Sequence, residues 1–338
     1  MIPKKTYLPV ISSLRGWAAT AICFYHFVWS TANYIENEFI RTIFYYAQYG
    51  VPMFFVISGV VLPLSMLNNN YQFKHLSTFI SKRLIRLEPP YLVSLILGAL
   101  YLIFQSYRHT DVMAFSWTNF LLHLGYLIPF VEGQQWINPI YWSLAVEFQY
   151  YLFLSIGWLA LSHSKSYWRY SIYIIMLTAC FISQDKALVF RWLPLFLIGI
   201  VYVLHQSKKI DFKEYLVISL LSLFSILYWL GLCNMLVTLF TLSIIHYYPN
   251  HNPFYSNWIG QRSYSLYLLH LIIGQALVNF LSHSYRLPYQ KVLVILLGYG
   301  ISLFAAWLLH KYIEKPSQIA AQQLIYPNSS TKHKINIE

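Results

Sequence analysis

The sequence has little charge for its length. Asp, Glu, Lys and Arg make up only 10% of its 338 residues, against roughly 25% in soluble globular domains. Apolar residues make up 58%, and so few charges could not cover that much apolar surface in water. The composition therefore excludes an ordinary soluble protein and indicates that lipid surrounds most of the chain.

Cysteine is also scarce. Cys23, Cys180 and Cys233 are the only three, and each lies in an apolar segment without metal-like spacing. We therefore expect neither a disulfide framework nor a metal site. The sequence also lacks a Walker loop, a glycine-rich dinucleotide fingerprint and a solenoid repeat. Its polar stretches are too short for a second catalytic domain, so any chemistry must be built among the helices.

The net charge of +12 does not indicate nucleic acid, because the basic residues form no continuous stripe. They lie scattered in short loops, as in membrane proteins. The apolar runs predict an all-α polytopic membrane protein with about ten transmembrane helices of about 20 residues each. These spans are expected at 9–31, 44–67, 88–106, 140–162, 168–184, 188–205, 214–230, 232–248, 263–282 and 290–313.

Arg15 interrupts the first apolar run, so we interpret that run as a retained membrane helix and not as a signal peptide. The stretch 115–131 is too short for a span and suggests an interfacial or re-entrant piece. With ten spans both termini share one side, and most of the 23 Lys and Arg residues fall on it. That side is therefore predicted to be cytoplasmic. We expect a membrane domain over 1–316 and a polar cytoplasmic tail without fixed structure over 317–338.

Ionisable residues inside spans are functional candidates, because lipid disfavours them. Arg15 and His26 share one face of the first helix, about 16 Å apart along its axis, and that face suits an extended ligand with an anionic head. Alternatively, Arg15 reaches toward headgroups and His26 only bonds a neighbour. Glu147 and Ser143 share a face of the fourth span, at a depth like that of His26. Glu147 could therefore orient His26 as a base, or the two could form a structural ion pair.

Arg83 and Arg86 lie side by side at the cytoplasmic entrance of the third span. Paired guanidiniums suit a phosphate ligand, although topology alone also favours arginine there. Supporting or substrate-contacting candidates come from the other motifs: Ser58, Trp142, Ser143, Tyr267, His270 and Glu314.

Taken in order, these segments resemble the membrane acyltransferase 3 family. The matching pieces are LRGWAATAICFYHF, MFFVISGVVL, KRLIRLEPPYL, YWSLAVEFQYYL, YSLYLLHLII and YIEKP. Glu88 departs from the family pattern, in which an aromatic or apolar residue is common. The resemblance is to the stand-alone form, without the extracytoplasmic hydrolase-like domain that some relatives carry.

The resemblance implies an O-acyltransferase of the bacterial inner membrane that uses cytoplasmic acyl-CoA, most commonly acetyl-CoA. Its acceptor would be a hydroxyl of a cell-envelope carbohydrate or lipid-linked glycan. Carried over, His26 and Glu147 are the catalytic candidates, and Arg15, Arg83 and Arg86 are the donor-binding ones. His26 would act as a base or be acylated itself, and a homo-oligomer stays open. The alternative is a non-enzymatic carrier or flippase for an anionic envelope precursor.

Overall fold

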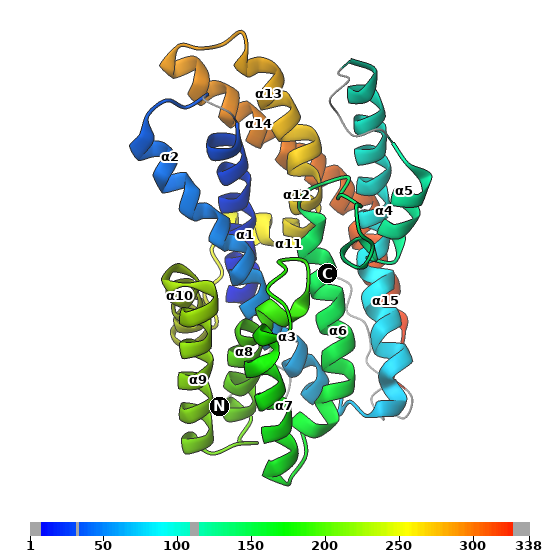
Figure 1. Cartoon of the computed structure of the whole chain (residues 1–338), viewed down its shortest axis with the longest axis vertical. Coiled ribbons are helices and arrows are strands. Elements are labelled where there is room, and N and C mark those ends of the chain that lie inside the picture. Colours follow the sequence, from blue (N-terminus) through cyan, green and yellow to red (C-terminus); the bar gives the residue numbers. More distant parts are fainter. Residues whose placement is uncertain (1–7, 32–33, 109–114, 327–338) are drawn as a thin grey trace.

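The computed structural model describes residues 8–31, 34–108 and 115–326, and this described part is helical without strands (Figure 1). Short π-helical and 3-10 turns extend or join several helices. The α-helices in chain order are α1 (Pro9–Phe24), α2 (Glu38–Tyr45), α3 (Gly50–Asn68), α4 (Leu76–Arg108), α5 (Trp117–Leu124), α6 (Tyr141–Leu161), α7 (Ser166–Thr178), α8 (Leu193–Gln206), α9 (Phe212–Leu230), α10 (Leu232–Tyr247), α11 (Phe254–Gln261), α12 (Ser263–Leu269), α13 (Ala276–Ser282), α14 (Pro288–Leu309) and α15 (Lys315–Gln323).

The burial of the helices follows from a bundle that has lipid as its solvent. Helix α8 is apolar all round and is buried from Leu193 to Leu204, against α3, α7 and α9. Helix α9 is almost as apolar, yet it leaves Leu220, Phe224 and Tyr228 exposed. An exposed apolar face of this length is stable only against hydrocarbon. The chain is therefore a multi-pass membrane protein.

Seven described helical stretches are long and apolar enough to cross a membrane. All ten predicted spans coincide largely with helix, but α1, α7 and α10 are not among these seven, so the number ten stays a prediction. The stretch 115–131 contains only the short helix α5 and one 3-10 turn. The seven stretches are Glu38–Asn68, Phe73–Tyr107, Tyr141–Leu161, Val189–Gln206, Phe212–Leu230, Ser263–Ser282 and Pro288–Gln323.

Two helices extend beyond the predicted boundaries. Helix α4 begins at Leu76, well before the predicted span at 88–106, and continues through two prolines. The polar tail is not without structure over 317–326, because α15 continues the last span and packs against α4. Pro316 lies in the first turn of α15, where its missing N–H is not needed. Lys82 donates a hydrogen bond to the Leu324 carbonyl, and the rest of the tail lies outside the described residues.

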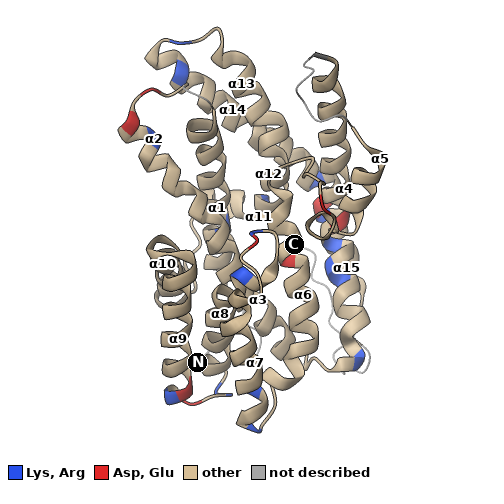
Figure 2. Ribbon diagram, viewed as in Figure 1, with Lys and Arg blue, Asp and Glu red and all other residues tan. Residues whose placement is uncertain are grey.

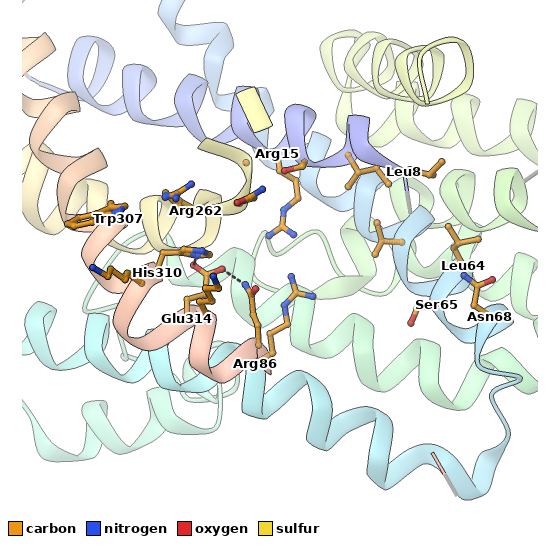
Figure 3. A pocket seen from close by; sticks show the side chains of 18 of the residues that line it. Leu8, Arg15, Leu64, Ser65, Asn68, Arg86, Arg262, Trp307, His310 and Glu314 are labelled. Atoms are coloured by element: carbon orange, nitrogen blue, oxygen red, sulfur yellow. Dashed lines mark hydrogen bonds and ion pairs between the residues drawn. The ribbon is translucent and has the colours of Figure 1, made fainter. Parts of the chain in front are cut away.

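Glycines let α1 approach α11 closely. A Cβ atom added at Gly260 would lie 1.7 Å from the Ser12 carbonyl oxygen, and one added at Gly16 would lie 2.3 Å from that of Ser256. Small residues at helix interfaces allow such contact in membranes. The contact places Arg262, at the end of α11, across from Arg15 on α1 (Figure 3).

We predict that Gly260→Ala separates α1 from α11 and lowers the melting temperature of the purified protein in detergent. The expected cost is about 1–3 kcal/mol, typical of an overpacked interface. The matched control is Gly300→Ala, since a Cβ at Gly300 would have no atom within 4 Å. Equal melting temperatures for the two variants would contradict this packing argument.

Candidate functional site

The polar residues inside the bundle surround a row of cavities that share wall residues. One cavity has a volume of about 710 Å³ and is lined by Arg15, Arg86, Arg262, His310 and Glu314, among others (Figure 3). We call it the arginine chamber. Helices α1, α3, α11 and α14, together with the first turn of α15, supply most of its wall. Most of the ribbon carries no charged residue, so the few charged positions within the helices stand out (Figure 2).

Two arginines of the arginine chamber are open to an anion. Arg15 from α1 and Arg86 from α4 extend toward the same space (Figure 3). Arg83, one turn before Arg86, borders the adjacent small cavity and lies over the Phe79 ring at 5.4 Å. Within the part of the chain that the structure describes, none of these three guanidiniums lies in an ion pair. Unpaired guanidiniums in a cavity are suited to a phosphate ligand.

The Glu314 carboxylate balances part of this charge. It accepts hydrogen bonds from Ser265 Oγ at 2.6 Å and from Gln318 Nε2 at 2.8 Å, and it lies 3.0 Å from His310 Nδ1. His310 and Glu314 bound a π-helical turn that joins α14 to α15. The carboxylate is therefore held by its own segment and by α12, and it orients the His310 ring beside the arginines.

A narrow neck follows the arginine chamber. It consists of two cavities of about 60 and 40 Å³ that share Arg15, Glu147 and Tyr264 as wall residues. The Glu147 carboxylate accepts hydrogen bonds from Ser58 Oγ at 3.1 Å and from Tyr151 Oη. A volume of this size holds a few water molecules. The neck is therefore closed to a larger ligand in this conformation.

Tyr267 and Ser143 form the far side of the neck. Their hydroxyl oxygens lie 2.6 Å apart, and each hydroxyl also reaches the Ile140 carbonyl. Tyr267 lines both the neck and a second large cavity of about 460 Å³. This cavity, which we call the histidine chamber, contains His26 and the indole of Trp142.

His26 lies beside His270 and not beside Glu147. The ring centroids of the two histidines are 5.2 Å apart, and His26 Nδ1 lies 3.3 Å from Ser30 Oγ. His270 is fully buried, and its Nδ1 lies 2.7 Å from the Tyr267 carbonyl oxygen. A carbonyl accepts only, so the His270 proton is on Nδ1. His270 Nε2 is then an acceptor, and it has no hydrogen-bond partner among the described residues.

The predicted contact between His26 and Glu147 is wrong in this structure, because Glu147 bonds Ser58 and Tyr151 instead. The physical reason is local. His26 lies in a π-helical turn, Tyr25–Ser30, which breaks the α-helical spacing assumed for its face. The other predicted site residues do line the two chambers or the neck, apart from His270, which lies directly behind the His26 ring.

Comparison with known proteins identifies the chain. The sequence profile of the acyltransferase 3 family, described as an acyltransferase domain, matches residues 9–311. The chain belongs to this acyltransferase family. No solved structure matches it.

Curated relatives of this acyltransferase are distant in sequence. A protein of Acidianus two-tailed virus named "Putative acetyltransferase ORF330" is 26% identical over 81% of this chain and 86% of its own length. A Staphylococcus aureus protein named "Putative O-acetyltransferase SACOL0978" is 26% identical over 93% of this chain. The chain spans only 58% of that relative. The Listeria monocytogenes "Peptidoglycan O-acetyltransferase OatA" is 26% identical over 44% of this chain and 24% of its own length.

Sequence reasoning missed several residues that line the acyltransferase's chambers. His310 carried a usable signal, since it precedes Glu314 by one helical turn. Arg262 lies two residues before the YSLYLLHLII motif, so its position beside that motif was a usable signal too. Glu88, the departure from the family pattern, accepts a hydrogen bond from Tyr126 at 2.8 Å and lines a small cavity beside Glu147.

We predict that Glu147→Gln lowers the thermal stability of the acyltransferase. Glu147 shares its cavity with Arg15, Arg83 and Arg86, and a buried positive cluster that loses its nearby anion is destabilised by about 1–3 kcal/mol. The melting temperature in detergent measures this loss. Glu132→Gln removes a carboxylate from an exposed loop position and should leave the melting temperature unchanged. A Glu147→Gln protein as stable as that control would show that the carboxylate does not balance the arginines.

Proposed function

We propose that this protein transfers an acetyl group from cytoplasmic acetyl-CoA to a hydroxyl of a cell-envelope carbohydrate or lipid-linked glycan. One observation carries the proposal. A chamber with unpaired guanidiniums is followed, through a narrow neck, by a second chamber that contains a histidine pair. This arrangement suits an extended, polyanionic donor that enters at one side and an acceptor that enters at the other.

The arginine chamber suits the nucleotide end of the donor. Its volume of about 710 Å³ falls within the roughly 300–1,000 Å³ of small-molecule sites. Arg15 and Arg86 would grip the diphosphate, since guanidiniums bind phosphate oxygens bidentately. Arg262 would add a further donor, and Glu314 would hold the His310 ring in place.

The neck has to open during the reaction. The pantetheine arm would pass Arg83 and Glu147 and displace the Tyr267 hydroxyl from Ser143, because cavities of about 60 and 40 Å³ are too small for it. Only a donor with its thioester extended would reach His26. Closure of the neck in the absence of donor also limits leakage of water and ions between the two chambers.

His26 would act as the base in the histidine chamber. It takes the proton of the acceptor hydroxyl, whose oxygen then attacks the thioester carbonyl carbon. The carbon–sulfur bond breaks, an ester forms, and the CoA thiolate takes the proton back from His26. The Tyr267 carbonyl holds the His270 proton at Nδ1. His270 Nε2 would therefore remain an acceptor beside the His26 ring.

The names of relatives, which are described as acetyl- and O-acetyltransferases, support acetyl as the transferred group. The unpaired guanidiniums of the arginine chamber support a donor with phosphate groups.

The arginine chamber opens near Asn68, Asn69 and Lys315, at segments that loop charge assigns to the cytoplasm. We therefore place the protein in a bacterial inner membrane with both described ends of the chain cytoplasmic.

We predict that His26→Ala and Arg86→Gln separate the two halves of the reaction. His26→Ala should bind acetyl-CoA normally but lose transfer by at least about 100-fold, as expected when a general base is removed. Arg86→Gln should weaken acetyl-CoA binding by about tenfold or more, because a charge-assisted hydrogen bond is lost. Calorimetry with the purified protein measures binding, and mass spectrometry of envelope glycans measures transfer.

The matched controls are an exposed histidine and an exposed cationic side chain outside both chambers. His251→Ala and Lys208→Gln should leave both measurements unchanged. A protein that neither binds nor hydrolyses acetyl-CoA would be a carrier, and full transfer by His26→Ala would remove His26 from the mechanism. Labelled acetyl retained on the wild-type protein without acceptor, but not on His26→Ala, would make His26 the nucleophile.

We predict that His270→Gln lowers the transfer rate constant less than His26→Ala does, because His270 lies beside the His26 ring and does not line the chamber. Its KM for acetyl-CoA should not change, because His270 does not line the arginine chamber. A purely structural role would instead lower the melting temperature, with kcat of the folded fraction unchanged. The pH profile of transfer separates the two cases, since only a partner of His26 shifts it.

A further inference from the structure

The histidine chamber has a charge pattern that the reaction itself does not require. Lys186 and Arg191 both line it, and none of the described residues that line it is an aspartate or a glutamate. We propose that this chamber recognises its acceptor through an anionic group, a carboxylate or phosphate carried by the sugar that is acylated. The inference rests on the proposed function and names the class of acceptor.

The two cations are not neutralised by the protein. Within the residues that the structure describes, neither Lys186 nor Arg191 forms an ion pair. The adjacent Asp185 does not line the chamber, and its Oδ1 accepts a hydrogen bond from the Ala187 amide at 2.8 Å. Arg191 donates from one terminal nitrogen to the Gln184 carbonyl and lies over the Trp192 ring. This holds the guanidinium in place while its Nε remains without a partner.

The remaining wall is suited to a sugar. The rings of Trp142 and Trp192 stack with their centroids 5.5 Å apart, and Tyr25 and Tyr49 line the same cavity. Flat aromatic surfaces cover the apolar faces of a pyranose ring and leave its hydroxyl groups free for polar contacts. Such contacts are available at Gln48 and Asn234, whose side chains carry unpartnered polar atoms, Nε2 and Oδ1 respectively.

Location strengthens the inference. Segments predicted to face away from the cytoplasm carry few basic residues. Two other basic residues on that side, Lys291 and Arg41, do not line the histidine chamber. Lys291 lies 2.8 Å from Glu36 and lowers the pKa of that carboxyl group, and Arg41 lies over the Trp29 ring. Lys186 and Arg191 instead border a cavity, together with the proposed catalytic histidine. Topology does not account for two unpaired cations at that place.

The test measures binding to the full-length purified protein without acetyl-CoA, so it does not depend on catalysis. The charged probe is an oligosaccharide that contains glucuronate, and the matched neutral probe is the same oligosaccharide with its carboxyl groups reduced to hydroxymethyl groups. A third arm uses a neutral oligosaccharide that carries one phosphate ester. Acetyl-CoA binding is measured separately, so a failure of the proposed donor chemistry is visible by itself.

We expect the wild-type protein to bind a charged probe at least about tenfold more tightly than the neutral one, as for a hydrogen bond to a charged group. Lys186→Gln and Arg191→Gln should each remove most of that preference and leave neutral-probe affinity unchanged. Preference for the glucuronate arm or for the phosphate arm identifies which anion the acceptor carries. Arg191→Lys keeps the charge and should retain much of the preference, even where Arg191→Gln folds poorly.

Arg286→Gln is the control, because Arg286 is exposed on the same predicted side but does not line the chamber. It should keep the full preference. The proposal is overturned if both charged probes bind no better than the neutral one. It is equally overturned if Arg286→Gln loses as much preference as Lys186→Gln, since the preference would then arise from general surface charge.

Discussion

Three guanidiniums inside an apolar bundle, with no ion pair among the residues that the structure describes, are the constraint on which this structure depends. A charged side chain in a span costs about 2.5–3.5 kcal/mol on insertion scales, so Arg15, Arg83 and Arg86 are tolerated only with compensation. The compensation comes from two carboxylates, Glu147 and Glu314, each fixed by hydrogen bonds to its own neighbours. Because those carboxylates bond hydroxyls, an amide and a histidine, the guanidiniums keep free donors that face a cavity.

Interrupted helices place the histidines around this charged centre. His26, His270 and His310 each lie in a π-helical turn, Tyr25–Ser30, His270–Gln275 and His310–Glu314. A π-helical turn shifts the following side chains relative to regular α-helical spacing, and such turns are frequent at functional sites. Close glycine contacts complete the geometry: Gly16 and Gly260 bring α1 against α11, and Gly59 and Gly199 bring α3 against α8. Gly260 also lines the arginine chamber, so the contact between α1 and α11 closes part of its wall.

The sequence singled out most of the ionisable residues that line these cavities, but it did not predict their pairing. An arginine and a histidine in one apolar run stand out because lipid disfavours both, and Glu147 stands out for the same reason. The expected pairing of His26 with Glu147 assumed regular helices and equal depth. The π-helical turn at Tyr25–Ser30 and the Ser58 and Tyr151 hydroxyls changed that pairing. His270, which the sequence predicted only as a supporting or substrate-contacting residue, takes the place beside His26.

Composition and local pattern determined that lipid surrounds the chain, that it is helical, and which rare polar residues lie within it. These properties belong to single segments, since hydropathy and helical period act over about 20 residues. The tertiary structure alone decided that Arg86 and Glu314 share one chamber, that Lys186 and His26 share another, and that Tyr267 stands between the two. A cavity is bounded by helices far apart in the chain, and its shape follows from side-chain volumes and close backbone contacts that no single segment specifies.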